Sequence, residues 1–294
     1  MNAKTKLPIL FAVLAAVCYG ISAPISKLLL EKIPPTQMAA LLYLGAGAGM
    51  FAVNALGKQG RKEQVEAKIT RHEWRYVAGM IALDIAAPIL LMFGLTMTTP
   101  ANASLLNNFE IAATSVIALS VFKETIGRRM WAAIALITIS SMILSFENLS
   151  RFSFSLGSLL VLAACICWGI ENNCTRMLSL KSPIQIVIVK GFGSGIGALA
   201  IALARREATS DALYVISALV LGFFAYGLSI FFYIKAQREL GAARTSAYYA
   251  IAPFVGTALS FVVFRQSVTV SFVIALVIMI IGAYLSTVTY TLTR

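Results

Sequence analysis

Two short stretches, "CYGISAPISK" at residues 18–27 and "CWGIENNCTR" at residues 167–176, open almost identically and lie 149 positions apart. Each is embedded in a long apolar run, where Trp, Glu and Asn are unusual. Further along, "LGAGAGM" at 44–50 is matched by "FGSGIGA" at 192–198. Because the matched segments keep their order and a nearly constant spacing, the sequence predicts an internal repeat.

The composition predicts that both copies lie in a membrane. Of the 294 residues, 59% are hydrophobic and 12% are charged, whereas soluble domains carry roughly 25% charged residues. A helix needs about 20 largely apolar residues to cross a bilayer. Ten runs are long enough in our interpretation, at about 7–30, 37–56, 74–95, 101–122, 128–146, 156–178, 184–204, 212–235, 243–264 and 269–290.

The repeat divides these spans equally, with five in residues 1–147 and five in residues 148–294. Because five is odd, the second copy enters the membrane from the opposite side. Inverted repeats of this kind place a substrate site near the middle of the bilayer, between the halves, and support alternating access. We therefore expect an all-α integral membrane protein with a central cavity, and with the fifth and tenth spans at the periphery.

The net charge of +12 is best explained by topology and not by a nucleic-acid partner. With the N-terminus inside, the inner loops and ends hold 17 of the 24 Lys and Arg residues, and the outer loops hold six. Such an excess marks the cytoplasmic side. The sequence thus predicts a multi-pass protein with both termini in the cytoplasm.

Cysteine and histidine usage argues against a metal, a redox site or an enzyme. The four cysteines fall inside predicted spans without a C-x-x-C pair, and the only histidine, His72, lies in the polar segment 57–73. We expect no metal, no cofactor and no catalytic residues.

The glycine-rich run "GFGSGIG" at 191–197 could suggest a nucleotide-binding loop, but it lies within a predicted span. A nucleotide loop would follow a strand and open a helix. Glycines four residues apart instead allow helix backbones to approach closely. We expect helix packing at Gly45, Gly49, Gly191, Gly193, Gly195 and Gly197.

Polar residues recur at membrane depth. Ionisable groups inside spans are costly and mark either a functional site or a buried pair. Asp84 and Glu110 lie near mid-depth in neighbouring spans, so we expect them to face one cavity. Helical spacing extends the candidate cavity lining to Tyr19, Ser22, Asn107, Trp168, Asn172, Tyr226, Tyr248 and Tyr249. The alternatives are interhelical hydrogen bonds or packing, and interfacial anchoring for tyrosines such as Tyr43.

The sixth span also predicts a gate. Its Trp168 would form the floor of the cavity, and Glu171 and Asn173 would line an inner gate or vestibule. Tyr19 and Ser22 would be the outer counterpart, because the first span runs the other way. Lys190, about a third of the way into the seventh span, is either a gate partner or a side chain that extends to the inner surface.

These features resemble the drug/metabolite transporter superfamily, EamA-type. The resemblance is clearest in the segment "LTMTTPANASLLNNFEIAATSVIALSVFKETIG" and its second copy "LGAARTSAYYAIAPFVGTALSFVVFRQSV". The first copy keeps Glu110 of a Glu-Pro pair but has Ile111 instead of Pro, and the second keeps Pro253 but has Ala252 instead of Glu. A symmetric scheme with two carboxylates therefore does not carry over.

The resemblance, closest to bacterial exporters of aromatic amino acids, implies export of amino acids and related small metabolites through the inner membrane. The bilayer and a small-molecule substrate would be the partners, one chain would suffice for the pathway, and a larger assembly remains open. The rival hypotheses are export of drug-like cations or nucleotide sugars, a lipid-modifying membrane enzyme, and a passive channel.

Overall fold

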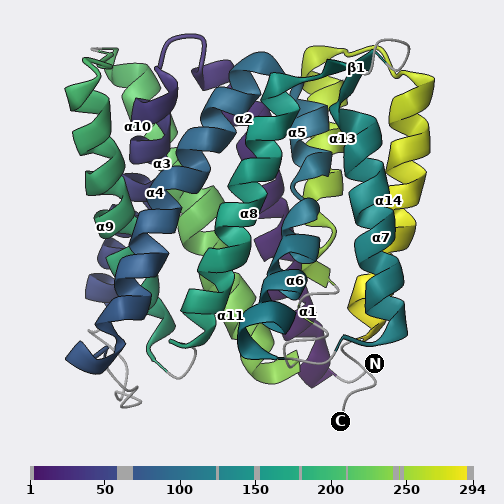
Figure 1. The fold of residues 1–294 in the computed structure, drawn as a ribbon. Helices are drawn as coiled ribbons and strands as arrows, with labels where there is room; N and C mark the ends of the chain where they lie inside the picture. The colour runs from purple at the N-terminus through teal and green to yellow at the C-terminus, as the bar shows by residue number, and fades with distance from the viewer. Residues whose placement is uncertain are drawn as a thin grey trace.

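The computed structural model describes residues 3–57, 69–123, 126–148, 153–178, 181–209, 211–240, 245 and 248–289. They form a helical bundle in which the long helices run up and down between two ends (Figure 1). The first half contains α1 (Ala3–Gly20), α2 (Ser22–Leu29), α3 (Pro35–Gly57), η1 (Arg71–Glu73), α4 (Trp74–Met97), α5 (Pro100–Leu106), α6 (Phe109–Phe122) and α7 (Arg128–Ser145). The second contains α8 (Leu156–Arg176), α9 (Pro183–Ala204), α10 (Ala212–Gly222), η2 (Phe223–Leu228), α11 (Ser229–Leu240), α13 (Ala252–Phe264) and α14 (Val270–Thr289).

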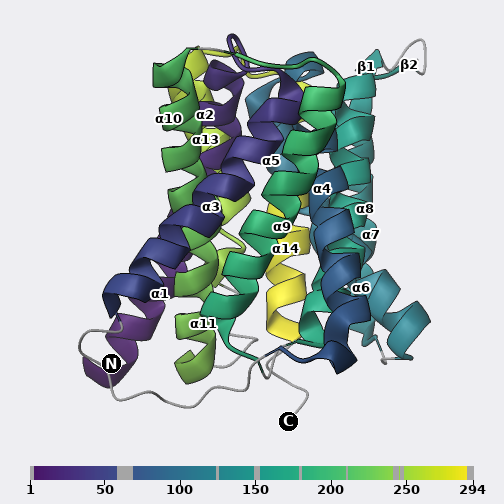
Figure 2. The ribbon, with the colours of Figure 1, turned by 90° about the vertical axis from the view of Figure 1, so that its left-hand side faces the viewer.

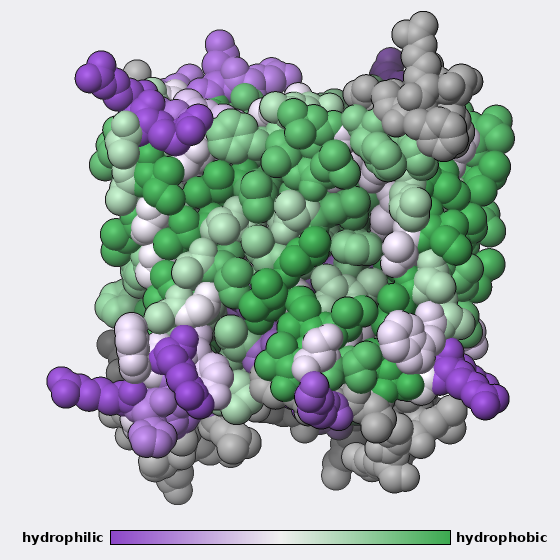
Figure 3. Space-filling view, viewed as in Figure 1, coloured by the Kyte–Doolittle hydropathy of each residue, from purple (hydrophilic) through white to green (hydrophobic). Residues whose placement is uncertain are grey.

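Eight helical stretches of the described chain are long and apolar enough to cross a membrane. Two shorter apolar helices, Ala252–Phe264 and Val270–Ser286, lie where the ninth and tenth spans are predicted. The face seen in Figure 3 carries a broad apolar band between polar ends. This distribution matches a bundle whose middle is surrounded by hydrocarbon.

Local sequence sets several helix starts. Thr99, Ser155 and Asp211 precede α5, α8 and α10, and their side chains accept hydrogen bonds from main-chain N–H groups of the first turn. These residue types are preferred there because they satisfy donors that have no partner inside the helix. Proline opens α9 as Pro183, where its missing N–H costs nothing.

A short hairpin departs from the all-α expectation. Strands β1 (Phe146–Asn148) and β2 (Ser153–Phe154) pair antiparallel between α7 and α8. The Phe146 and Phe154 rings stack with centroids 4.4 Å apart. The hairpin lies at the upper end of the bundle in Figure 1, between the two repeats.

Helix pairing follows the repeat. The closest packing occurs between α3 and α9, α4 and α8, α1 and α11, and α7 and α14. Counted by predicted span, these pairs are the second with the seventh, the third with the sixth, the first with the eighth, and the fifth with the tenth. Exchanging the two repeats maps this set of pairs onto itself, as expected for two copies related by a pseudo-two-fold axis.

The two copies enter the bundle in opposite directions. In Figure 1, α1 and α2 lead upward from the lower end, whereas α8 leads downward from the hairpin. The upper end gathers Lys27 from the end of α2, Leu95 from the end of α4 and Gly157 from the start of α8. The corresponding first helices of the two repeats therefore run antiparallel.

Candidate functional site

Several helices are interrupted at similar depth. The α1–α2 helix breaks at Ile21, and α5 gives way to α6 at Asn107 and Asn108. In the second repeat, η2 inserts a π-helical segment between α10 and α11, and α13 begins only after a turn at residues 250–251. Interrupted helices free main-chain groups that can bind a solute.

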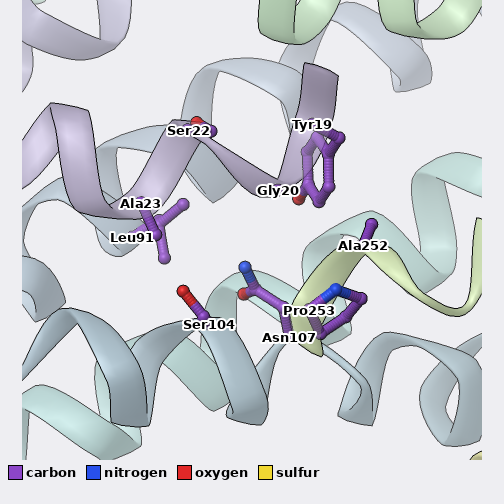
Figure 4. Close-up of a pocket in the computed structure, with 9 residues that line it drawn as sticks. All are labelled: Tyr19, Gly20, Ser22, Ala23, Leu91, Ser104, Asn107, Ala252 and Pro253. Carbon is purple, nitrogen blue, oxygen red and sulfur yellow. The ribbon is translucent and has the colours of Figure 1, made fainter. Parts of the chain in front are cut away.

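A small cavity lies where three of these interruptions meet. Its volume is about 10 Å³, which is roughly the room for one water molecule. Figure 4 shows the lining, which comes from Tyr19, Gly20, Ser22, Ala23, Leu91, Ser104, Asn107, Ala252 and Pro253. Ser104 Oγ is buried without a hydrogen-bond partner among the described residues. The cavity is too small for a metabolite.

An ion-pair cluster joins α4, α8 and α9. Lys190 Nζ lies 3.1 Å from Asp84 Oδ2 and 3.0 Å from Glu171 Oε1. Asp84 is fully buried, Glu171 is 1% exposed, and the Lys190 side chain is 13% exposed. The Thr175 hydroxyl also donates to Glu171 Oε1. Lys190 therefore points inward and compensates two carboxylates contributed by different repeats.

Tyr43 completes this cluster. Its hydroxyl donates to Asp84 Oδ1 at 2.8 Å, and the Trp168 side chain lies near Tyr43. Tyr43 is 3% exposed, so anchoring at the membrane surface is the wrong interpretation for this tyrosine. This role is not visible in the sequence, because the partner Asp84 lies 41 residues away.

Glu110 is held separately, at the start of α6. Asn172 Nδ2 donates to Glu110 Oε1 at 2.6 Å and to Thr114 Oγ1 at 3.3 Å. Asn173 instead bonds main-chain oxygens, donating to Gly169 O at 2.8 Å and to Thr114 O at 3.2 Å. Asn172 thus orients a carboxylate, whereas Asn173 joins α8 to α6.

Tyrosine rings connect the cavity to the carboxylates. Tyr19 packs against Tyr226 and Tyr249 with ring centroids 6.0 Å apart in each case. Tyr226 also lies 5.2 Å from Tyr43, and its hydroxyl accepts from Ser22 Oγ at 3.5 Å. The cluster comes from both repeats.

The predicted site residues therefore fall into several neighbouring groups and not around one cavity. The cavity holds Tyr19, Ser22 and Asn107, the ion-pair cluster holds Asp84, Glu171 and Lys190, and Glu110 lies with Asn172. Tyr248 is half-buried beside Tyr249, and its carbonyl accepts from Ile251 N at 3.4 Å. Among the described residues, the ring contacts to Tyr19 and Tyr233 are made by Tyr249 and not by Tyr248.

The predicted packing glycines lie against other helices. A Cβ atom on Gly45 would come within 2.0 Å of Leu219 O, and one on Gly49 within 2.0 Å of the Phe223 ring. The second-repeat glycines meet α3 and α4 residues, at Gly47 for Gly191, Leu44 for Gly195, Ile81 for Gly193 and Ile85 for Gly197. These contacts bring α3 and α9 together beside the ion-pair cluster.

A second hollow opens at the upper end of the bundle. It has a volume of about 390 Å³ and is lined by Lys27, Thr96, Thr98, Asn102 and Ser155 among others. Lys27 Nζ donates to the carbonyls of Leu95 and Thr98, at the end of α4. A cation at this position satisfies helix carbonyls that lack an internal partner. Within the described residues, no group of three or more His, Cys, Asp or Glu side chains could hold a metal ion.

Comparisons with known proteins identify transporters as relatives of this chain. The model of the EamA-like transporter family matches residues 6–146 and again residues 155–288. An uncharacterized transporter of Methanothermobacter thermautotrophicus is 27% identical over 287 residues, covering 92% of this chain and 83% of the relative. The uncharacterized transporter YyaM of Bacillus subtilis is 21% identical over 272 residues, covering 90% of this chain and 88% of the relative.

A solved crystal structure shares the fold, with a TM-score of 0.69 over 98% of both chains. Its sequence is 15% identical to this chain. At that identity the likeness concerns the fold alone.

Proposed function

Because this chain belongs to the EamA-like transporter family, we propose that it exports amino acids, aromatic ones included, and related small metabolites by alternating access through the central cavity. The proposal includes ten membrane spans, both termini in the cytoplasm, and a place in the bacterial inner membrane. The excess of Lys and Arg in the predicted inner loops supports this orientation.

The observation that carries the proposal is the meeting of tyrosine rings and carboxylates at the helix interruptions. Tyr19, Tyr226 and Tyr249 offer ring faces that stack on apolar side chains or attract an ammonium group. Glu110 provides a carboxylate that accepts a hydrogen bond from the Asn172 amide and makes no ion pair among the described residues. An amine-bearing solute with an apolar side chain matches this combination.

The free main-chain and hydroxyl groups supply the remaining contacts. Pro88 lacks an N–H and so leaves the carbonyl of Asp84 without its helical partner in α4. Ser104 Oγ and Asn108 Oδ1 are buried without hydrogen-bond partners among the described residues. Such groups favour a ligand or water that pairs with them.

The volume of about 10 Å³ indicates a closed arrangement of the cavity. A metabolite enters only if helices separate at one end of the bundle. Alternating access requires that the two ends open at different times, so we assign this arrangement to an occluded state between the two open ones.

Counterflow in proteoliposomes tests the substrate class. The purified protein is loaded with one unlabelled amino acid, and the uptake of labelled aromatic and aliphatic amino acids is followed. We expect exchange with aromatic amino acids first. Absence of exchange with every amino acid tested would rule out the proposed substrate class, and the effect of an imposed pH gradient would decide proton coupling.

Glu110→Gln tests the site. The amide keeps an oxygen that accepts from Asn172, so folding is preserved while the negative charge is lost. We expect counterflow to fall about tenfold, which corresponds to the loss of one charged hydrogen bond. The matched control is Glu31→Gln at the exposed end of the α1–α2 helix. Equal transport by the two variants would remove Glu110 from the binding site.

Export of organic cations is the second candidate. Asp84, Glu171 and Glu110 outnumber Lys190, the one cation that pairs with them in the described interior. An excess of carboxylates favours a solute with a net positive charge. Aromatic amines without a carboxylate, added to the same counterflow panel, separate the two candidates by which group exchanges faster.

A further inference from the structure

We propose that two matching hydrogen-bonded clasps, one at each end of the bundle, determine which end opens, with Gln37 and Gln185 as their positioning residues. The upper clasp consists of Thr36, Gln37, Glu207 and Thr209, and the lower clasp of Ile69, Glu73, Lys181 and Gln185. This inference rests on the proposed alternating access, but not on the identity of the substrate.

The upper clasp ties the start of α3 to the loop between α9 and α10. Gln37 Oε1 accepts from Thr209 N at 2.8 Å, and Glu207 Oε2 accepts from Thr36 N at 3.0 Å. Arg205 Nε pairs with Glu207 Oε1 at 2.6 Å. Gln37 is 8% exposed. The clasp therefore holds a helix of the first repeat to a loop of the second.

The lower clasp ties the start of α9 to the segment that leads into α4. Gln185 Oε1 accepts from Ile69 N at 3.2 Å, and Lys181 Nζ pairs with Glu73 Oε1 at 2.9 Å. Here a helix of the second repeat is held to a segment of the first. The start of α3 and the start of α9 lie at opposite ends of the bundle (Figure 2).

The repeat makes the two clasps equivalent. Gln37 and Gln185 are each two residues after the proline that opens their helix, Pro35 or Pro183. Each glutamine accepts from a main-chain N–H in a segment of the other repeat that leads into a helix, α10 for Gln37 and α4 for Gln185. A glutamate of that segment makes a second bond, Glu207 to Thr36 and Glu73 to Lys181. Gln37 and Gln185 thus accept equivalent hydrogen bonds at equivalent positions of the two inverted repeats.

Both clasps are closed in this structure, in which the cavity has a volume of only about 10 Å³. Each clasp bridges residues more than 100 positions apart, 172 for Gln37 with Thr209 and 116 for Gln185 with Ile69. Separation of the repeats at one end must therefore break the bonds at that end. A weakened clasp favours opening at its own end and, in alternating access, reduces the time that the other end is open.

Hydrogen exchange of the full-length protein in nanodiscs, followed by mass spectrometry, tests this inference without a substrate. Gln37→Met removes the acceptor and keeps the length of the side chain. We expect exchange about fivefold faster in the upper segments 35–40 and 205–209, the scale of one hydrogen bond, and slower than wild type in the lower segments 69–76 and 181–188. Gln185→Met should give the opposite pattern.

The slower exchange at the distant end is the decisive result, since simple loss of a structural contact leaves that end unchanged or loosens it. The variant with both substitutions should return the ratio of upper-end to lower-end exchange rates towards the wild-type value. The matched control is Gln266→Met, at a half-buried glutamine that belongs to neither clasp. If Gln37→Met does not fold, Glu207→Gln weakens the same clasp.

Unchanged or faster exchange at the far end in both single variants would overturn the clasps as gates. That result would leave the proposed substrate untouched, because counterflow is a separate measurement. Conversely, absence of counterflow with every amino acid tested would not decide whether the clasps act as gates, because hydrogen exchange is measured without a substrate.

Discussion

At the scale of single residues, the charge balance at the centre of this protein depends on Lys190, which pairs with two buried carboxylates. Lys190 lies between Asp84 and Glu171 at about 3 Å from each. Removing one partner of a buried ion pair is far more destabilising than replacing the whole pair, because the remaining charge stays buried. Lys190 therefore stabilises the fold mainly by preventing that penalty.

Lys190→Met should lower the free energy of unfolding by about 3 kcal/mol. The variant leaves two buried carboxylates without their cation, and thermal denaturation in detergent measures the loss. Combining it with Asp84→Asn and Glu171→Gln should recover much of the stability. Lys32→Met, at an exposed lysine, is the matched control. Similar melting of the two lysine variants would argue against this role.

How far the sequence predicted the site depends on which residue is considered. Asp84 and Glu110 were recognisable because a carboxylate in an apolar run is costly wherever the run folds. Tyr43 was not recognisable, because tyrosine is also common at membrane surfaces. Its hydrogen bond to Asp84 exists only in the folded bundle. The inward orientation of Lys190 also depends on partners in other helices.

At the scale of elements, glycines set how closely the helices approach. Gly45 places α3 against Leu219 of α10, and a Cβ there would overlap the Leu219 carbonyl. Gly191 and Gly47 meet where α9 crosses α3. A helix cannot shift away at one crossing without disturbing the other.

Gly45→Ala should therefore destabilise the protein by about 2 kcal/mol, the usual cost of overpacking. Thermal denaturation of the purified variant provides the measurement. Gly127→Ala is the control, because a Cβ at Gly127 would meet nothing within 4 Å. Equal melting temperatures for the two variants would show that the α3–α10 contact adapts without cost.

The upper clasp should respond to acid. Partial burial raises the pKa of Glu207, but hydrogen bonds from Arg205 and Thr36 outweigh it and leave the pKa below the usual 4.5. A lowered pKa in the folded state means that this stabilisation is complete above pH 4.5 and is lost as the pH falls below that value.

The expected result is faster exchange in segment 205–209 below pH 4.5, after correction for the intrinsic rate at each pH. Glu207→Gln cannot be protonated and should remove the pH dependence of this segment while leaving that of segment 69–76. A pH dependence that persists in Glu207→Gln would assign the effect to another group.

Helix existence was predictable and helix continuity was not. The predicted spans at 74–95 and 128–146 closely match α4 and α7, because apolar runs of that length are seldom anything else. The interruptions at Ile21 and at Asn107–Asn108 carry no proline at the break itself. Pro24 accounts for the first interruption, because it leaves the Gly20 carbonyl without its helical partner, whereas no residue type at Asn107–Asn108 signals the second.

At the scale of the whole molecule, the repeat governs the pairing of helices. Each of the four closest pairs, α3 with α9, α4 with α8, α1 with α11 and α7 with α14, joins one repeat to the other. The internal matches predicted that two similar halves exist. They did not predict that the halves interlock, because matching segments say nothing about which helices are neighbours.

This interlocking predicts that the covalent connection through the β1–β2 hairpin is not needed for assembly of the two halves. It is the covalent link between halves that already hold each other through four helix pairs. Two separately translated polypeptides, cut between Asn148 and Ser153 and produced in the same cell, should therefore assemble into a transport-competent particle, while either fragment alone should be degraded. Co-purification through a tag on one fragment measures this, and a heterodimer of unequal halves would then be a working form of a protein normally made as one chain.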